Sequence, residues 1–340
     1  MSQQLGVSSQ AELPSASPLL GDMAGIPGQA RRDLDAAKKS RSLWGNAWRQ
    51  FKRHKLAMAG LVVLAVMIVS TFVGNLIYPR DESFIDWTLT GTMGYGLSPS
   101  LEYPFGTDSL GRDILARVLW GGRISIAVGL LAALVAITLG TVIGATAGFL
   151  GGFADSLLMR ITDMFISLPQ LPLLLLISFL YRDDIYNLFE KRFGDGNLGI
   201  FVLIVLVIAV LNWMSTARLV RAQFLSLKEK EFVEAAKSIG ARESTLMFKH
   251  ILPNVLSPII VAATLAVGAA IITESSLSFL GLGFPSDVPT WGRLLFDYKD
   301  FIQLAPYQSI LPGLMIFLTV LSINYVGDGL RDALDPRRSR

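Results

Sequence analysis

The amino-acid sequence predicts an all-α, polytopic membrane protein with six transmembrane helices. Hydrophobic residues make up 52% of the 340 residues and charged residues only 17%, whereas soluble domains contain about 25% charged residues. The apolar residues are concentrated in six runs, and a helix needs about 20 such residues to cross a bilayer. Because backbone polar groups cannot stay unpaired in lipid, the runs must be helices. They are residues 56–78, 124–150, 164–181, 198–220, 257–276 and 305–327.

The composition excludes several kinds of site. The chain has no cysteine and only two histidines, His54 and His250, so disulfides and a His-based metal cluster are excluded and we expect no metal site. No Gly-Lys dipeptide occurs in the sequence, although a phosphate-binding Walker A loop needs that pair before Ser or Thr. We therefore expect no catalytic residues and no cofactor in this chain. The net charge of +3 indicates membrane topology signals and no nucleic-acid partner.

The first 42 residues differ in composition from the rest of the chain. They are rich in Ser, Ala, Gly and Pro, and we expect a disordered cytoplasmic tail over 1–42, with a docking role as the alternative. They are no secretory signal, because the next apolar run is longer than the roughly 7–15 residues of a signal core. Trp44, Trp48 and Phe51 then recur among basic residues, which predicts an amphipathic helix on the inner leaflet. Ordinary charge flanking a membrane span is the alternative explanation.

The distribution of basic residues predicts the orientation. With the N-terminus inside, most of the 30 Lys and Arg residues fall in inner segments, so both termini are predicted to be cytoplasmic. We expect an N-terminal region over 43–121, with the amphipathic helix, the first span and an outer loop. The main transmembrane domain follows over 122–328, and a second cytoplasmic tail over 329–340.

Two local patterns concern the outer loop and the second span. Asp108 is a plausible N-cap for a short helix over 109–120, which we expect to lie on the outer surface. Asp113 and Arg117 are four residues apart within it and can pair. In the second span a glycine recurs every fourth residue, which lets another helix approach closely, and that helix belongs either to this chain or to a partner. These glycines are Gly140, Gly144 and Gly148.

The polar segment between the fourth and fifth spans predicts a helix, a glycine turn and a second helix in the cytoplasm. Residues 231–239 contain good helix formers, and Gly240 is a natural left-handed stop. A second helix is expected over 242–252, and Pro253 should break it where the chain re-enters the membrane. The alternative is a solvated loop with incidental helicity.

Small side chains and one carboxylate mark the first of these helices. Ala235 and Ala236 give it a flat face, and Glu234 can accept hydrogen bonds from an Arg of another protein. Together with Gly240 and Leu252-Pro253, the Glu-Ala-Ala segment resembles the coupling loop of type I ABC importer permeases. The pair His250-Ile251 is similar to the peptide branch of that family.

Three further stretches, within about 43–335, resemble the C-type permease subunit of dipeptide, oligopeptide and nickel importers. They are residues 105–113, 274–283 and 289–292. The resemblance implies a permease subunit of the bacterial inner membrane that forms half of a pathway for di- or oligopeptides or a related small solute. It also implies a second homologous permease, two ATP-binding-cassette ATPases that hydrolyse ATP, an extracytoplasmic substrate-binding protein and membrane lipid as partners. The implied ATPase-coupling residues are Glu234, Ala235, Ala236, Gly240, Leu252 and Pro253.

Four polar residues within the spans are candidates for the solute pathway, namely Glu274, Ser275, Ser276 and Asn212. Ionisable groups inside membranes are costly and usually functional, so Glu274 either lines the pathway, pins an outer gate or touches interfacial water. Asn212 either lines the pathway or forms interhelical hydrogen bonds, and we favour the hydrogen bonds.

Other classes of membrane protein remain as alternatives. An ion-coupled secondary transporter usually carries buried acidic or histidine relays and internal repeats. Apart from Glu274 the predicted spans are nearly free of charge, and no repeat is visible. A membrane scaffold without transport activity is the third alternative. The polar loop predicted over 181–197 is longer than is usual for the family that the sequence resembles. The substrate therefore stays open among dipeptides, oligopeptides, nickel and modified peptides.

Overall fold

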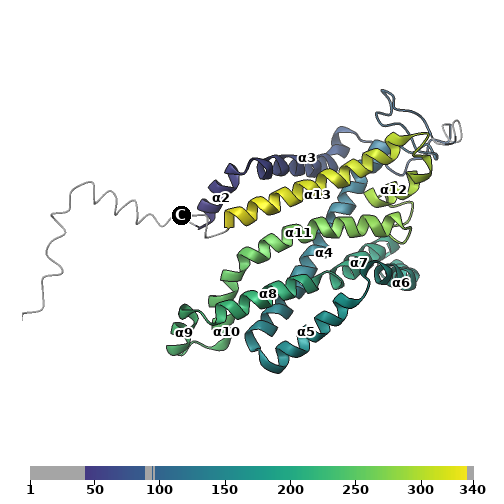
Figure 1. Cartoon of the computed structure of the whole chain (residues 1–340). Helices are drawn as coiled ribbons and strands as arrows, with labels where there is room; N and C mark the ends of the chain where they lie inside the picture. Colours follow the sequence, from purple (N-terminus) through teal and green to yellow (C-terminus); the bar gives the residue numbers. More distant parts are fainter. Residues whose placement is uncertain (1–42, 89–93, 95, 335–340) are drawn as a thin grey trace, which may run out of the picture. The chain divides into compact units, whose positions relative to one another are not determined.

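The computed structural model describes residues 43–88, 94 and 96–334, and all the regular elements in that part of the chain are helices (Figure 1). The predicted tail over 1–42 and the last six residues of the predicted tail over 329–340 lie outside the described residues. The chain divides into two compact units after Asn46. The larger unit contains all the helices after α2 (Leu43–Arg53). They are α3 (Lys55–Ile77), α4 (Ile114–Leu150), α5 (Gly152–Ser167), α6 (Gln170–Phe193), α7 (Gly196–Val210), α8 (Trp213–Lys228), α9 (Glu231–Ser238), α10 (Glu243–Thr245), η1 (Leu246–Ile251), α11 (Leu252–Phe279), α12 (Trp291–Tyr298), η2 (Lys299–Phe301) and α13 (Pro306–Leu334).

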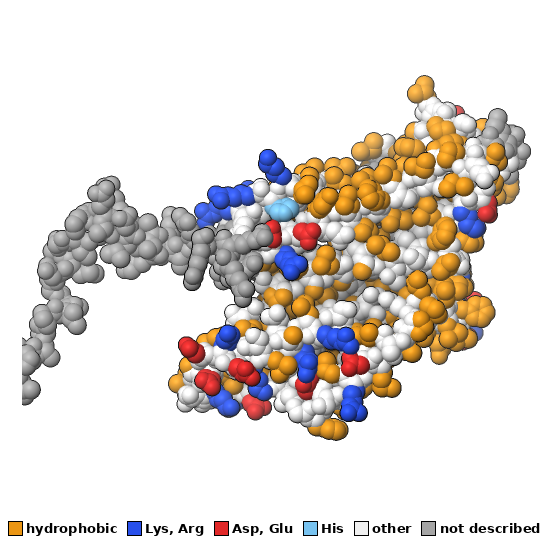
Figure 2. Space-filling model, in the orientation of Figure 1, with side chains coloured by type: hydrophobic (Ala, Val, Ile, Leu, Met, Phe, Trp, Pro, Cys, Tyr) orange, Lys and Arg blue, Asp and Glu red, His pale blue; other side chains and the backbone are white. Residues whose placement is uncertain are grey.

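Six potential membrane spans are confirmed, although two of them are bent. Four segments are long and apolar enough to cross a membrane as single helices, at Lys55–Gly74, Ile114–Leu150, Glu243–Phe279 and Pro306–Leu334. Two bent pairs of helices bring the number to six if each pair is one span: α5 and α6 meet at 86°, and α7 and α8 meet at 42°. On the face shown in Figure 2, apolar side chains are dense along α3 and toward the right of the view, and charged side chains gather at the end of the bundle where α9 and the start of α3 lie and along the lower edge.

The predicted bounds of the third span were wrong. The expected helix over 164–181 is broken between α5 and α6, because Leu168 is extended, at φ −78° and ψ 137°, as a residue before proline prefers to be. Pro172 is tolerated because it lies in the first turn of α6, where N–H groups have no intrahelical partner. The polar loop expected over 181–197 is also largely helical, since α6 continues until Gly194 ends it at φ +74°.

The predicted separate helix over 109–120 is not formed: residues 109–113 form a turn, and residues 114–120 are the first part of α4. Asp108 does not cap it: its Oδ1 accepts hydrogen bonds from Leu110 N at 2.9 Å and Arg112 N at 3.0 Å in the preceding turn. The cap is Asp113, whose Oδ1 accepts from Ala116 N at 3.2 Å. With 37 residues, α4 is about 55 Å long at 1.5 Å per residue. It therefore exceeds the roughly 30 Å hydrocarbon core, and one helix serves as outer element and span.

Helix α4 lies at the centre of the bundle, in contact with α3, α7, α8 and α11. Its glycine stripe faces α8: a Cβ added to Gly144 would lie 2.3 Å from Ala217 O, and one added to Gly148 would lie 2.7 Å from Phe224 Cβ. The close helix contact expected from these glycines is therefore made within the chain. Ion pairs between Arg221 and Asp155 and between Arg218 and Asp163 fasten α8 to α5.

The predicted amphipathic helix before the first span is present as α2 (Leu43–Arg53). Phe51 is buried against Ala57 and Ala333, whereas Trp48 is half exposed and Lys52 Nζ lies 5.1 Å above its ring. Apolar contacts thus hold one face of α2 to α3 and to the end of α13, which continues to Leu334. Its basic side chains are exposed, and its position on the inner leaflet stays a prediction.

Candidate coupling surface and solute pathway

The first helix of the predicted coupling loop is closed by a complete glycine turn. Gly240 has φ +84°, the left-handed conformation that favours glycine. Gly240 N donates to Lys237 O at 3.0 Å and Ala241 N donates to Ala236 O at 3.1 Å, which is the Schellman arrangement of a helix end. The expected helix and turn are therefore confirmed.

The second helix of the loop differs from the prediction at Pro253. A short α-helical turn, α10, leads into the π-helix η1 and then directly into α11. Pro253 does not break this path, because it lies at the start of α11, where its missing N–H costs no helical hydrogen bond. The helical path is consequently unbroken from α10 through η1 into the fifth span.

The two faces of α9 have different environments. Val233 and Ala236 are buried in a cluster with Phe224 and Ile251, so Ala236 does not contribute to an open flat face as expected. Ala235 and Glu234 are exposed. Large apolar side chains also remain exposed around the loop, on Phe232, Ile239 and Phe248. The helix is therefore anchored on one side and presents apolar groups and a carboxylate on the other.

Glu274 lies at the other end of α11 and is fully buried. Its carboxylate accepts hydrogen bonds from hydroxyl groups on α4, on α11 and at the start of α12. The donors are Ser278 at 2.8 Å, Thr290 at 2.9 Å, Ser125 at 3.2 Å and Ser275 at 3.4 Å. Contact with interfacial water is excluded for the arrangement seen here, and the geometry fits a pin between helices.

The two serines beside Glu274 are placed differently. Ser275 is buried, and a Cβ added to Gly292 on α12 would lie 2.5 Å from its Cα. Ser276 is half-buried and donates to the carbonyl oxygen of Ile272 within α11, at 2.8 Å. Their part in a solute pathway stays a prediction.

A cluster of charges joins the outer loop to α12. Asp297 lies between three guanidinium groups: Arg293 Nε at 2.8 Å, Arg117 at 3.4 Å and Arg112 at 4.0 Å. Arg117 therefore pairs with Asp297, and the expected pair with Asp113 is not formed; Asp113 binds Tyr78 and Arg80 instead. Burial raises the pKa of the Asp297 carboxyl above its ordinary value, and the guanidinium groups oppose that shift.

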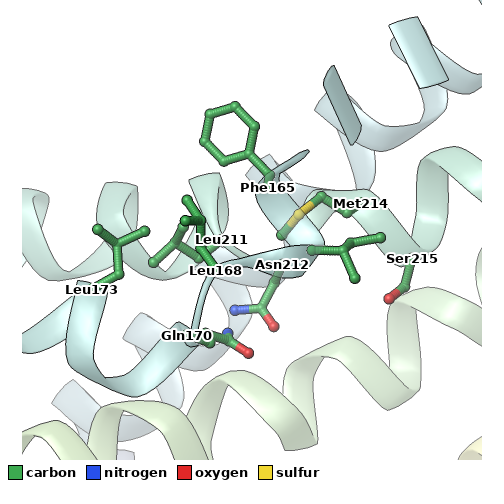
Figure 3. A pocket seen from close by; sticks show the side chains of 9 residues that line it. Phe165, Leu168, Gln170, Leu173, Leu211, Asn212, Met214 and Ser215 are labelled. Atoms are coloured by element: carbon green, nitrogen blue, oxygen red, sulfur yellow. The ribbon is translucent and has the colours of Figure 1, made fainter. Parts of the chain in front are cut away.

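Asn212 belongs to a different site, at the bends of the two broken spans. It lies between α7 and α8 and lines a cavity of about 170 Å³ together with residues on both sides of the α5–α6 break (Figure 3). The sequence interpretation missed Gln170 here, because a polar residue between Pro169 and Pro172 is typical of a turn. Glu274 does not line this cavity, so the four pathway candidates do not form one site.

Two family profiles match the sequence. The family described as binding-protein-dependent transport system inner membrane component matches residues 140–340. The family described as the N-terminal transmembrane domain of oligopeptide transport permease C matches residues 42–93.

Individual relatives are similar over most of the chain. The oligopeptide transport system permease protein OppC of Haemophilus influenzae is 39% identical over 88% of this chain and 90% of its own length. The dipeptide transport system permease protein DppC of Alkalihalophilus pseudofirmus is 38% identical over 87% of this chain and 90% of its own length. The glutathione transport system permease protein GsiD of Pectobacterium atrosepticum is 37% identical over 88% of this chain and 93% of its own length.

Proposed function

We propose a function from the premise that this chain belongs to the family of binding-protein-dependent transport system inner membrane components. As a permease subunit of an ABC importer, it forms half of a pathway for peptides or peptide-like solutes. The names of its relatives support this substrate class, since they refer to oligopeptides, dipeptides and glutathione. The subunit does no chemistry itself; partner ATPases hydrolyse ATP.

The surface of α9 is the observation that carries the coupling proposal. An exposed helix that is anchored on its back face, and joined by the glycine turn to the helical path of α10, η1 and α11, can pass a displacement on to the fifth span. Exposed Phe232, Ile239 and Phe248 offer apolar contacts to a groove, and Glu234 offers a carboxylate to an Arg. We assign this surface to one ATPase subunit, with Ala235, Ala236, Gly240, Leu252 and Pro253 as the residues that shape it.

The remaining subunits follow from the same proposal. A second, homologous permease completes the pathway, a second ATPase docks on it, and an extracytoplasmic binding protein delivers the solute. Both termini and α9 lie in the cytoplasm, the membrane domain covers 122–328, and the segments before 43 and after 328 are cytoplasmic tails. We assign the two broken spans, α5–α6 and α7–α8, and the hydroxyl groups that bond to Glu274 to the part of the subunit that lines the pathway.

The glycine turn provides the test of coupling. Gly240→Pro removes the N–H that donates to Lys237 O and forbids positive φ, whereas Gly240→Asn keeps access to the left-handed region. In proteoliposomes with all subunits, Gly240→Pro should abolish ATP-driven peptide uptake, and Gly240→Asn should retain most of it. Normal uptake by the proline variant would refute the coupling role.

A charge reversal tests the docking surface itself. Glu234→Lys should lower ATPase binding and uptake at least tenfold, because it places a cation against the Arg that Glu234 is proposed to meet. The matched control is Glu82→Lys, which makes the same change at a partly exposed residue of the outer loop. An equal loss of ATPase binding and uptake in both variants would contradict the assignment of this surface to the ATPase. Uptake that needs no ATP would instead favour an ion-coupled transporter.

A further inference from the structure

The cavity at the two helix bends carries polar groups that the coupling proposal does not use. Its lining comes from both breaks: Phe165, Ile166, Leu168, Gln170 and Leu173 on α5 and α6, and Leu211, Asn212, Met214 and Ser215 on α7 and α8. None of these nine described residues is charged. Figure 3 shows the amide groups of Gln170 and Asn212 turned toward the same part of the cavity, with Ser215 beyond them.

These polar groups have unused hydrogen-bonding capacity. Asn212 Nδ2 donates to Ile208 O at 2.7 Å, which fixes the orientation of the amide, and its Oδ1 accepts no hydrogen bond from the described residues. Gln170 and Ser215 are exposed and likewise bond to no described residue. One oriented acceptor, one amide without a side-chain partner among the described residues and one hydroxyl therefore lie at the cavity.

The surroundings indicate that this cavity is not simply a lipid contact. A polar group facing hydrocarbon without a partner costs several kcal/mol, and the ends of two broken helices add backbone groups without intrahelical partners. Interrupted helices at membrane depth are tolerated where they line a polar cavity or are buried in protein. These groups therefore need partners outside the described residues, from a ligand, water or another chain.

The chemistry of the lining selects the ligand. With no charged residue among those described, the site is suited to neutral dipoles and not to an ionised terminus, which would need a counter-charge. Amides and hydroxyls complement the N–H and C=O groups of a peptide main chain, and Met214 beside Phe165 provides an adaptable apolar wall. The volume of about 170 Å³ is below the roughly 300–1,000 Å³ of pockets that enclose whole ligands.

We propose that this cavity is a main-chain subsite, in which Gln170 and Asn212 hydrogen-bond one peptide unit of the solute during translocation. The inference rests on the proposed import of peptides and adds the site that contacts them. Because the subsite contacts only main-chain groups, we expect it to bind peptides with different side chains with similar affinity.

Uptake kinetics of the complete complex in proteoliposomes test the subsite, with a dipeptide, a pentapeptide and glutathione as probes. Gln170→Leu removes the mobile amide. Asn212→Ser removes the acceptor, while its hydroxyl can keep the bond to Ile208 O. Each variant should raise the KM for uptake about 2- to 10-fold, as expected for one lost hydrogen bond. Gln223→Leu, on α8 outside the cavity, is the matched control.

The outcomes separate the two proposals. If the unaltered complex imports none of the probes, peptide import itself fails. If it imports a probe and the Gln170 and Asn212 variants match the control, the subsite is refuted. Loss of the partner permease on purification of either variant would also refute it, because the amides would then be interface contacts. Since the chain has no cysteine, Gln170→Cys gives a unique thiol in it, and peptide should slow its labelling by a maleimide.

Discussion

At the residue scale, one carboxylate connects three helices near the end of α11. Ser125 on α4 and Thr290 at the start of α12 both donate to Glu274. Thr290 also caps α12 by accepting from Arg293 N at 3.1 Å, so the position of α12 depends on the same cluster. A buried carboxylate with four hydroxyl donors leaves those donors unpartnered when it is removed, and each unsatisfied group costs about 1–3 kcal/mol.

Replacing Glu274 should therefore destabilise the protein strongly. Glu274→Ala is expected to lower the free energy of unfolding by at least about 2 kcal/mol, while Glu274→Gln keeps an acceptor oxygen and should lose less. Thermal unfolding in detergent gives the comparison. Ser276→Ala is the control, because Ser276 bonds only within its own helix. Equal melting temperatures for Glu274→Ala and this control would show that the cluster contributes nothing.

The sequence revealed this carboxylate but not its partners. Glu274 is conspicuous because it interrupts an apolar run, whereas Ser125 is an ordinary serine 149 residues away. Tertiary packing brings these two residues together, and no local sequence pattern predicts that contact. Gln170 was missed for a related reason, since its importance depends on the second bend at Asn212.

At the element scale, the contact between α4 and α8 depends on backbone proximity. Gly140, Gly144 and Gly148 were recognised from their spacing, but the spacing did not identify the facing helix. Gly121 and Gly122 act in the same way: a Cβ added to Gly122 would lie 2.2 Å from Thr71 and 2.7 Å from Trp291. The missing side chain at Gly122 therefore lets Thr71 and Trp291 pack against α4 in the stretch between the predicted outer helix and the predicted second span.

A methyl group at Gly144 should separate α4 from α8. Gly144→Ala would place Cβ 2.3 Å from Ala217 O, and backbone must move to relieve the overlap, at a cost of about 1–3 kcal/mol. Gly313→Ala on α13 is the matched control, because its nearest contact, Leu295, would be 3.8 Å away. Melting temperatures of the two purified variants provide the measurement. If Gly313→Ala lowered the melting temperature as much as Gly144→Ala does, close packing of α4 against α8 would not be the cause.

At the scale of the whole molecule, the number of spans could be predicted because apolar length is a local property of the sequence. The bends could not, because Pro169 and Pro172 are compatible both with a kinked span and with a span that ends early. The orientation rests on the basic residues alone. In Figure 1, α9, the start of α3 and the end of α13 lie toward the same end of the bundle, which is the arrangement that an even number of spans requires.

Single cysteines can determine the orientation, since the chain has none of its own. An impermeant thiol reagent should label Ser238→Cys, next to the glycine turn, only from the cytoplasmic side. Ser83→Cys, in the outer loop, should be labelled only from the opposite side. Both serines are exposed, so accessibility does not bias the comparison. Labelling of Ser238→Cys from outside would overturn the topology and the coupling proposal with it.

The continuity of α10, η1 and α11 has a mechanical consequence. The helical segment Glu243–Phe279 has 37 residues and is about 55 Å long, with the π-helix at one end and Glu274 near the other. A displacement of the inner end would pass through the π-helix and Pro258 to the hydroxyl groups on α4 and α12 that bond to Glu274. Movement of the ATPase below the membrane and release of the Glu274 hydrogen bonds above it would then be coupled through this one helical segment.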